Sequence, residues 1–215
     1  MPSTTKMTSA SQARYNNTLF KNLIPIYDAV AIFLAPVRKR ITKELKLPKN
    51  SKVLDVACGT GTQALLLAKH GYQVSGIDLS TAMIKEAKLK TGTKYSINFV
   101  RGDATKLPFK NKAFDASTIS FGLHDMPENI RTKIIQEMKR VTKKGGRILI
   151  ADYATPSDGI VAKIERPVSN LFESKYFESF MNIGLNHYLR EAKLKKSKKA
   201  ILLVGIAQLV TCINQ

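Results

Sequence analysis

The residues best suited to bind a charged ligand lie in the segment VLDVACGTG, residues 53–61. Gly59 and Gly61 would let the backbone approach a ligand closely, and the helix expected after them would offer unpaired amide N–H groups. The run from Gly59 to Ala64 also fits the loose GxGxxG/A fingerprint of dinucleotide-binding proteins, so an NAD-linked oxidoreductase is one interpretation. Asp55 favours another, because a carboxylate at the end of the preceding strand would repel a pyrophosphate and would suit a cationic amino acid group.

His124 is the candidate for acid–base chemistry, since it follows an expected strand over residues 114–121. Its ordinary pKa lies near neutrality, so the imidazole could take a proton from a hydroxyl group or a ring carbon. A purely structural histidine is the commoner outcome, and both roles stay open. No metal is expected, because Cys58 and Cys212 are accompanied by no CxxC pair and no His/Cys cluster.

Strand-like and helix-like segments alternate through the middle of the chain and would position these residues. Short β-branched runs predict strands at 52–57, 73–77, 97–100, 114–121 and 147–151, and apolar periodicity predicts helices at 60–69, 81–90 and 128–141. Parallel neighbours need a crossover connection, so this alternation predicts an α/β fold with a doubly wound, Rossmann-like, mostly parallel sheet. Ligands bind such sheets at the carboxyl ends of the strands, where the strand order reverses.

The sequence indicates a single domain over residues 19–215, preceded by a mobile polar arm at 1–18. Within the domain we expect a helical lid at 19–47, a cofactor-binding core at 51–155, a substrate-side helical region at 156–192 and terminal strands at 196–215. Two short terminal strands, at 200–204 and 208–213, would form an antiparallel hairpin at the edge of the sheet.

The composition limits which binding partners and which cellular compartment we expect for this protein. The 215 residues carry 35 Lys plus Arg against 16 Asp plus Glu, a formal charge of +19. A solvated lysine-rich surface is the favoured explanation, with nucleic acid or an anionic membrane surface as alternatives. The polar N-terminus lacks a secretory signal, and the apolar runs fall short of the ~20 residues that a bilayer requires, so we expect a cytoplasmic protein.

Four segments resemble, in order, the motifs of class I S-adenosylmethionine-dependent methyltransferases. They are VLDVACGTG, VSGIDLS, FVRGDATKLPF and FDASTISFGLHDM. The resemblance implies that the first loop cradles the methionine part of the cofactor, that Asp78 binds the ribose hydroxyls and that Asp103 accepts from the adenine amino group. The cofactor would be S-adenosylmethionine, with S-adenosylhomocysteine as product. The predicted cofactor contacts are Tyr27, Asp55, Ala57, Gly59, Thr60, Gly61, Asp78, Leu79, Met83, Asp103, Ala104, Ser120 and Phe121.

Within that superfamily the chain is similar to the ubiquinone and menaquinone C-methyltransferases, the methyltransferase type 11 group. The similarity rests on LPF, FDASTISFGL and EMKRVTKKGGRILIADY with an upstream Tyr27-Asp28, and it covers about residues 20–155. The quinone enzymes usually carry Arg-Asn after FGL, whereas this chain has His124-Asp125. The resemblance implies an acceptor that is a small molecule, a quinone-like compound or a lipid, with peripheral contact to an anionic membrane as an accompanying hypothesis.

Other roles are open for two of the predicted contact residues, and other functions are open for the protein. Asp78 could cap the helix that begins near Ser80, and Asp103 could be a turn residue, since Asp is common in turns. Nucleic acid is the competing acceptor because of the charge, although the chain lacks the (D/N)PP(Y/F) box and the Pro-Cys pair of base-modifying enzymes. A non-catalytic protein that binds S-adenosylmethionine is the third interpretation, and the oligomeric state is left open.

Overall fold

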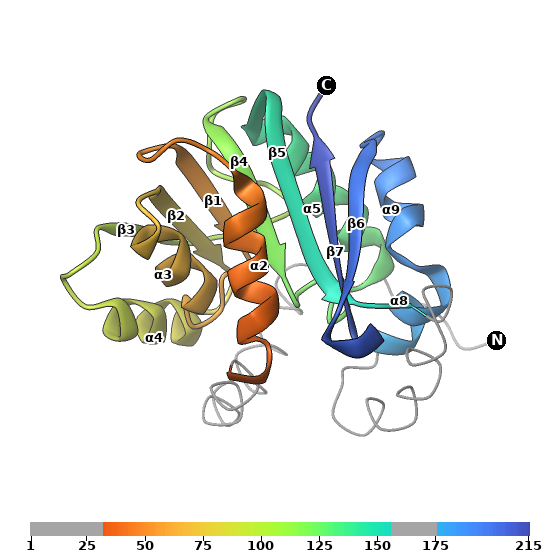
Figure 1. The fold of residues 1–215 in the computed structure, drawn as a ribbon, viewed down its shortest axis with the longest axis horizontal. Coiled ribbons are helices and arrows are strands. Elements are labelled where there is room, and N and C mark those ends of the chain that lie inside the picture. The colour runs from red at the N-terminus through yellow and green to blue at the C-terminus, as the bar shows by residue number, and fades with distance from the viewer. Residues whose placement is uncertain (1–31, 156–175) are drawn as a thin grey trace.

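The computed structural model describes residues 32–155 and 176–215, which build a seven-stranded sheet with helices on both faces (Figure 1). The strands are β1 (Lys52–Val56), β2 (Gln73–Asp78), β3 (Ile97–Arg101), β4 (Phe114–Ser120), β5 (Thr142–Tyr153), β6 (Lys196–Leu202) and β7 (Ala207–Ile213). The helices are α2 (Ala35–Leu45), α3 (Thr62–Lys69), α4 (Thr81–Thr91), α5 (Glu128–Val141), α8 (Phe177–Ile183) and α9 (Leu185–Glu191), and a 3-10 turn, η2, covers Leu203–Gly205. The predictions for Tyr27, for 1–31 and for 156–175 lie outside the described residues.

The strands follow the order β3-β2-β1-β4-β5-β7-β6, with the first five parallel. This confirms the predicted α/β fold and places the reversal of strand order between β1 and β4. Strand β7 pairs antiparallel with both β5 and β6, so only β6 of the terminal hairpin lies at the edge of the sheet. Strand β6 also begins at Lys196, four residues before the predicted start, because ladder pairing continues past a register shift between Lys196 and Lys198.

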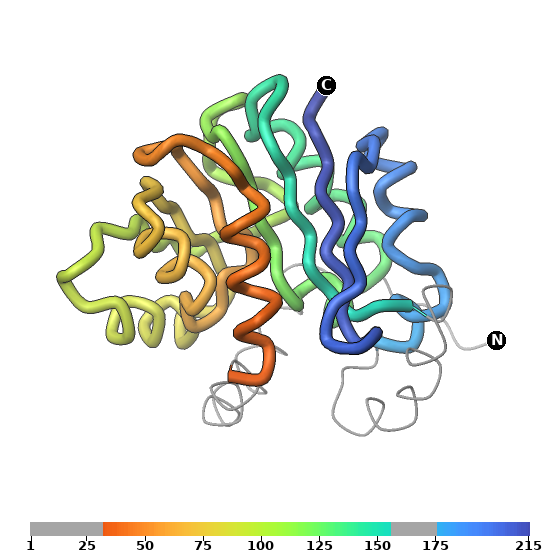
Figure 2. Tube along the Cα trace, in the orientation of Figure 1, coloured from red at the N-terminus to blue at the C-terminus, as the bar shows by residue number. Residues whose placement is uncertain are grey.

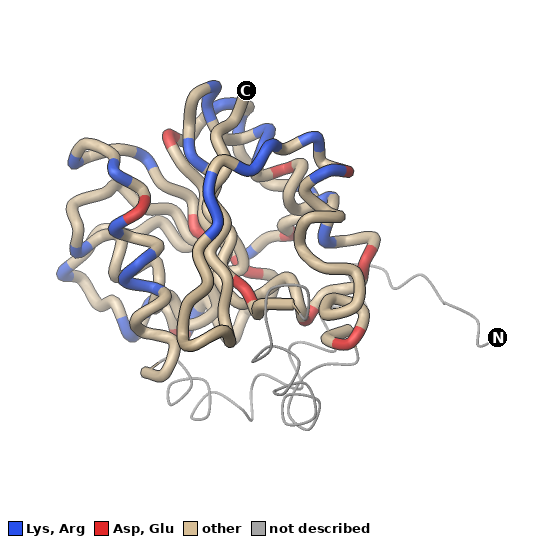
Figure 3. Tube along the Cα trace, turned by 45° about the vertical axis from the view of Figure 1, so that its right-hand side comes forward, with Lys and Arg blue, Asp and Glu red and all other residues tan. Residues whose placement is uncertain are grey.

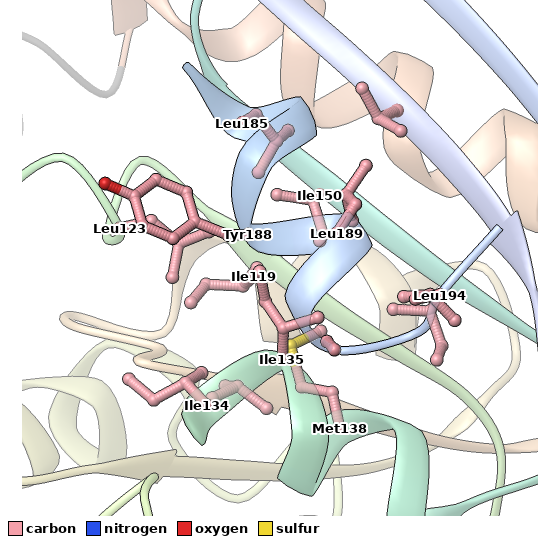
Figure 4. Packing of buried hydrophobic residues seen from close by; sticks show 14 of the residues in the cluster. Ile119, Leu123, Ile134, Ile135, Met138, Ile150, Leu185, Tyr188, Leu189 and Leu194 are labelled. Carbon is pink, nitrogen blue, oxygen red and sulfur yellow. The ribbon is translucent and has the colours of Figure 1, made fainter. Parts of the chain in front are cut away.

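Two apolar layers hold the helices to the sheet. On one face, buried side chains of α5, α8 and α9 pack with those of β4 and β5, as Figure 4 shows for Ile134 and Ile135 of α5 and Leu189 of α9. The helix predicted at 128–141 from its apolar periodicity is confirmed as α5, and its apolar residues Ile130, Ile134, Ile135 and Met138 are all buried. On the other face, α2, α3 and α4 cover the strands. The sheet is therefore buried on both faces, as parallel strands require.

Helix α2 is part of this second layer. Val37, Ile41 and Leu45 are fully buried, one helical turn apart, and the helix packs against α3 and against β4, β5 and β7 (Figure 2). The described part of the predicted helical lid at 19–47 covers the face of the sheet, because its apolar stripe has to be buried. A role of this segment as a lid stays a prediction.

Lys and Arg occur at many separate positions along the described chain (Figure 3). The edge strand β6 carries Lys196, Lys198 and Lys199, and Lys198 Nζ pairs with Glu44 Oε1 of α2 at 2.9 Å. Charged side chains on an edge strand oppose pairing with another chain. Among residues 32–155 and 176–215, no helix is long and apolar enough to cross a membrane, and no group of three or more His, Cys, Asp or Glu could hold a metal ion.

Candidate functional site

Asp55 lies on β1 beside β4, at the reversal of strand order. Its side chain is 1% exposed, and Oδ1 accepts a 2.8 Å hydrogen bond from Thr118 Oγ1, on the residue directly opposite in β4. Oδ2 is buried and has no hydrogen-bond partner among the described residues. Burial raises the pKa of Asp55 from 3.8 to about 7, although the Thr118 hydrogen bond, the Arg38 charge and a hydrogen bond from the Ala64 backbone lower it. A buried, unpaired carboxylate oxygen at this point fits a cationic group of a ligand.

The loop after β1 adopts backbone conformations that favour glycine. Gly59 and Gly61 have φ values of +53° and +75°, and Ala57 has +50°. A Cβ added to Gly59 would meet nothing in the described chain within 4 Å, whereas a Cβ on Gly61 would come 2.9 Å from Ala87 Cβ and Phe99 Cζ. Gly59 therefore borders open space that a ligand could fill, and Gly61 lets the start of α3 pack against α4 and β3.

Asp78, the last residue of β2, ties the glycine loop to the start of α4. Its Oδ2 accepts from the Gly59 N–H and its Oδ1 from the Ser80 N–H, both at 2.9 Å. Burial raises the pKa of Asp78, although these backbone hydrogen bonds lower it. Ser80 is the N-cap of α4, because its Oγ accepts from the Met83 N–H. Asp78 is therefore not the helix cap, and a carboxylate held beside the glycine loop fits a ribose diol.

Asp103 lies in the turn after β3. Its Oδ1 accepts from the N–H of Thr105 at 2.8 Å and from Thr105 Oγ1 at 2.7 Å. This is the local turn arrangement that the sequence left as the alternative. Ala104 is partly buried against the core. The contact of both residues with an adenine stays a prediction.

Two cations approach the glycine loop, and sequence reasoning singled out neither. Lys90 Nζ of α4 donates to Thr60 Oγ1 at 3.1 Å. Arg38 of α2 has buried Nε and Nη1 atoms with no hydrogen-bond partner in the described chain. Burial lowers the pKa of Arg38, and the charge of Asp55 raises it. The chain has 35 Lys plus Arg, and nothing in the local sequence distinguishes these two.

His124 follows β4 and is 4% exposed. Its Nδ1 lies 2.6 Å from Asp152 Oδ1, and its Nε2 lies 3.3 Å from Asp125 Oδ2. Burial lowers the pKa of His124, but the charges of Asp125 and Asp152 outweigh it and hold the pKa well above its ordinary value. The two carboxylates therefore favour the protonated ring over the neutral one. Its role as a base stays a prediction.

Long-range contacts fix the loop that carries His124. Asp152 Oδ2 accepts from the Leu123 N–H at 3.0 Å. The fully buried Arg131 donates from Nε to the Leu123 carbonyl at 3.0 Å and from Nη1 to the Tyr188 hydroxyl at 2.6 Å. The sequence did not identify Asp152 or Arg131 as residues that hold this loop, because their partners lie on other elements.

Aromatic rings surround the end of β4. Phe121, with a φ of +53°, meets Tyr153 edge-on with 5.8 Å between ring centroids, and both side chains are partly exposed. The His124 ring lies 4.8 Å from that of Tyr153 and 6.0 Å from that of Phe177, again edge-on. Positive φ at a bulky residue is costly and is found where the surrounding structure enforces it, often at functional sites.

Most of the predicted contact residues lie at the carboxyl ends of the parallel strands. After β1 come Ala57, Gly59, Thr60 and Gly61, and from the end of β2 into α4 lie Asp78, Leu79 and Met83. After β3 come Asp103 and Ala104, and at the end of β4 are Ser120 and Phe121. The loops after β1 and β4 are close, since a Cβ on Gly122 would lie 3.3 Å from Ala57 Cβ. Cofactor contact by each of these residues remains a prediction.

Sequence comparison matches residues 53–146 to a family model described as a methyltransferase domain. The demethylmenaquinone methyltransferase of Paenarthrobacter aurescens strain TC1 is 40% identical over 144 residues, which are 65% of this chain and 55% of that protein. The chain thus spans little more than half the length of this curated relative. The matched region includes the glycine loop and the strands β1 to β4.

Two solved structures share this fold over almost the whole chain. Magnesium protoporphyrin IX methyltransferase from Synechocystis PCC 6803, solved with bound S-adenosylhomocysteine, aligns with a TM-score of 0.70 at 16% identity, over 97% of this chain and all of that one. The [4+2]-cyclase SpnF aligns with a TM-score of 0.72 at 18% identity, over 97% of both chains. At such identities the likeness establishes the fold alone.

Proposed function

We propose that the chain carries a class I S-adenosylmethionine-dependent methyltransferase domain, as its motifs indicated, and that it methylates a quinone-like or lipid small molecule. The observation that carries the cofactor assignment is Asp55, whose buried Oδ2 lacks a partner among the described residues beside the open space at Gly59. A cationic amino acid end would satisfy that oxygen, and a pyrophosphate would not. The fold by itself is insufficient, since a [4+2]-cyclase shares it.

The acceptor assignment rests on the aromatic side chains at the end of β4. Phe121 and Tyr153 are partly exposed and meet edge-on, so they offer ring edges and faces to a flat apolar molecule. The relative from Paenarthrobacter aurescens is named for a demethylated menaquinone, which is such a molecule. A nucleic acid acceptor has less support, because the lysines of β6 are partly paired, as Lys198 is with Glu44.

The residues of the site would hold and orient two reactants. When bound, S-adenosylmethionine supplies a methyl group on a positively charged sulfur. Asp55 would bind the ammonium group, and Asp78 would bind the ribose hydroxyls next to the Gly59 amide. Asp152 fixes His124, and with it the loop after β4, so that an acceptor would be positioned by a rigid wall rather than by a mobile segment. Because His124 is buried and paired with Asp152, we assign it this positioning role before any role as a base.

Methyl transfer is tested with cofactor labelled on the methyl group. The protein is incubated with a demethylated menaquinone, oxidised or reduced, with phosphatidylethanolamine vesicles and with RNA, and each extract is analysed by mass spectrometry. We expect labelled product from the reduced quinone, because its ring carbon is electron-rich enough to attack a methyl group. Asp55→Asn, which keeps the shape and removes the charge, is the matched control and should lose most of the product.

Three other outcomes would change the proposal. Label in the phospholipid would move the acceptor to a membrane lipid headgroup. Label in RNA alone would replace it with nucleic-acid methylation. Binding of S-adenosylhomocysteine with no labelled product from any acceptor would favour the non-catalytic interpretation.

We further propose that the protein takes its acceptor from an anionic membrane surface. Exposed apolar side chains lie just before α2, where Ile32 and Phe33 are 78% and 54% exposed, and at the β6–β7 turn, where Val204 is 87% exposed. Both places lie at the lower edge in Figure 1, where the parallel strands end. Exposed apolar side chains on a protein with a formal charge of +19 suit a peripheral contact with an anionic membrane.

Vesicle cosedimentation tests this contact. Wild-type protein should sediment with vesicles that contain phosphatidylglycerol and less with neutral ones, and Phe33→Ser combined with Val204→Ser should reduce the bound fraction. Leu89→Ser, at a 67% exposed position on α4, is the control for a general loss of apolar surface. Equal sedimentation of all three proteins, or indifference to lipid charge, would contradict the proposal.

A further inference from the structure

The loop between β3 and β4, residues 102–113, carries Asp103 and contains neither helix nor strand. At its start the Gly102 N–H donates to the Asp78 carbonyl at 2.9 Å, and the Asp103 turn is closed by the Lys106 N–H, which donates to the Asp103 carbonyl at 3.1 Å. A segment without regular structure cannot pair all of its backbone groups internally. The position of this loop therefore depends on side chains from other elements.

Helix α5 supplies those side chains as one bidentate ion pair. Arg140 donates to Glu137, one helical turn earlier, from Nε to Oε1 and from Nη2 to Oε2, both at 2.7 Å. The same two side chains bind both backbone groups of Leu107, because Glu137 Oε2 accepts from its N–H at 2.7 Å and Arg140 Nη2 donates to its carbonyl at 2.9 Å. Arg140 Nη1 continues along the loop to the Phe109 carbonyl and to Asn111 Oδ1, each at 2.8 Å.

The charges of the pair stabilise each other. The hydrogen bond from Arg140 holds the pKa of Glu137 below its ordinary value, although burial raises it, and the same bond raises the pKa of Arg140. Both side chains are partly exposed, and ion pairs at such positions add little to the stability of a protein. A forked guanidinium that binds three groups of one loop does fix the geometry of that loop. The property that this pair controls is therefore the position of the loop.

We propose that Glu137 and Arg140 position the Asp103 turn so that its carboxylate can accept from the adenine amino group of the cofactor. The inference deepens the proposed function and rests on it, since it concerns how a bound S-adenosyl group is recognised. The turn lies between the anchor at Gly102 and the second anchor at Leu107. Without the second anchor the carboxylate would shift relative to the purine, and a shift of about 1 Å is enough to weaken a directional hydrogen bond. Both are positioning residues, because they act through Asp103.

Calorimetric titration with two ligands tests this role without measuring turnover. The ligands are S-adenosylhomocysteine and S-inosylhomocysteine, in which an oxygen replaces the amino group of the purine. Wild-type protein should prefer the adenosyl ligand by about 10- to 100-fold, because a carboxylate accepts from an amino group and repels a carbonyl oxygen.

Arg140→Gln should reduce this preference to about threefold or less, mainly through weaker binding of S-adenosylhomocysteine. Arg140→Lys keeps the charge without the fork and should lie between the two proteins. The matched control is Arg40→Gln, which makes the same substitution in the Arg40–Glu44 pair of α2, where the two side chains are 2.7 Å apart. It should keep the wild-type preference.

The ratio of affinities within one variant is insensitive to a partly unfolded sample, because both ligands titrate the same folded fraction. A wild-type preference in Arg140→Gln and Arg140→Lys, even if both ligands bind more weakly, would overturn the inference and show that the pair only supports the fold. Equal affinity of the wild-type protein for the two ligands would overturn the inference and leave the proposed function standing. Failure of the wild-type protein to bind S-adenosylhomocysteine would overturn both, so the two failures are distinguishable.

Discussion

The buried carboxyl of Asp55 should make the stability of the ligand-free protein depend on pH in a defined window. Its pKa is about 7 in the folded chain, against an ordinary value of 3.8. Because the folded-state pKa is the higher one, the stabilisation is complete below the unfolded-state value and is lost as the pH rises through about 7. Within that window the loss is about 1.4 kcal/mol per pH unit, or roughly 3 kcal/mol between pH 5 and pH 7.

Asp55→Asn isolates this contribution. Asparagine keeps an acceptor for Thr118 Oγ1 and does not titrate, so other ionisable groups cancel in the difference between variant and wild type. We expect the free energy of unfolding of the variant, minus that of wild type, to grow by roughly 3 kcal/mol from pH 5 to pH 7 and to level off above pH 8. Urea unfolding followed by circular dichroism at constant ionic strength measures it.

A difference that stays constant from pH 5 to pH 8 would refute the reasoning, since it would mean that Asp55 is already ionised at pH 5. A second readout comes from ligand binding. The cationic amino acid end should bind the ionised carboxyl, so the affinity of wild type for S-adenosylhomocysteine should rise with pH up to about 7, whereas that of Asp55→Asn should not.

Three further predictions concern the glycine loop and the loop after β4. Gly61→Ala should lower the free energy of unfolding by about 2–3 kcal/mol, because its φ is +75° and its Cβ would come 2.9 Å from side chains of α4 and β3. Gly59→Ala, which meets only the backbone penalty, should cost about 1–2 kcal/mol, and urea unfolding that reverses this order would count against the geometry. Asp152→Asn should bring the pKa of His124 down towards its ordinary value in an NMR titration of the ring, because one of the two carboxylates that raise it is lost; an unchanged titration would be the contrary result. Arg131→Met should destabilise the protein by about 3 kcal/mol or more in thermal or urea unfolding, because it leaves buried carbonyl and hydroxyl partners unpaired, and wild-type stability would contradict this account.

The sequence by itself determined the parallel core and the position of the site along the chain. The segment from Lys52 to Gly61 combines a β-branched run, an aspartate and two glycines, which are local signals of a strand, a ligand-binding loop and a helix start. The same kind of signal predicted the helices at 81–90 and 128–141, and the structure confirms both as α4 and α5. Such features depend on residues within about one turn or strand of each other, so a sequence displays them directly.

Only the tertiary structure decided which side chains meet. Thr118 bonds Asp55 across 63 positions of the chain, and His124 contacts Asp152 across 28. The pKa of His124 is raised because two carboxylates outweigh its burial, and one of them, Asp152, comes from a distant element. In the sequence Arg38 is one basic residue among many, and only the packing of α2 beside α3 brings it within the electrostatic influence of Asp55. Charge and hydrogen bonding in a buried site depend on distances in space, and the order of residues along the chain does not specify those distances.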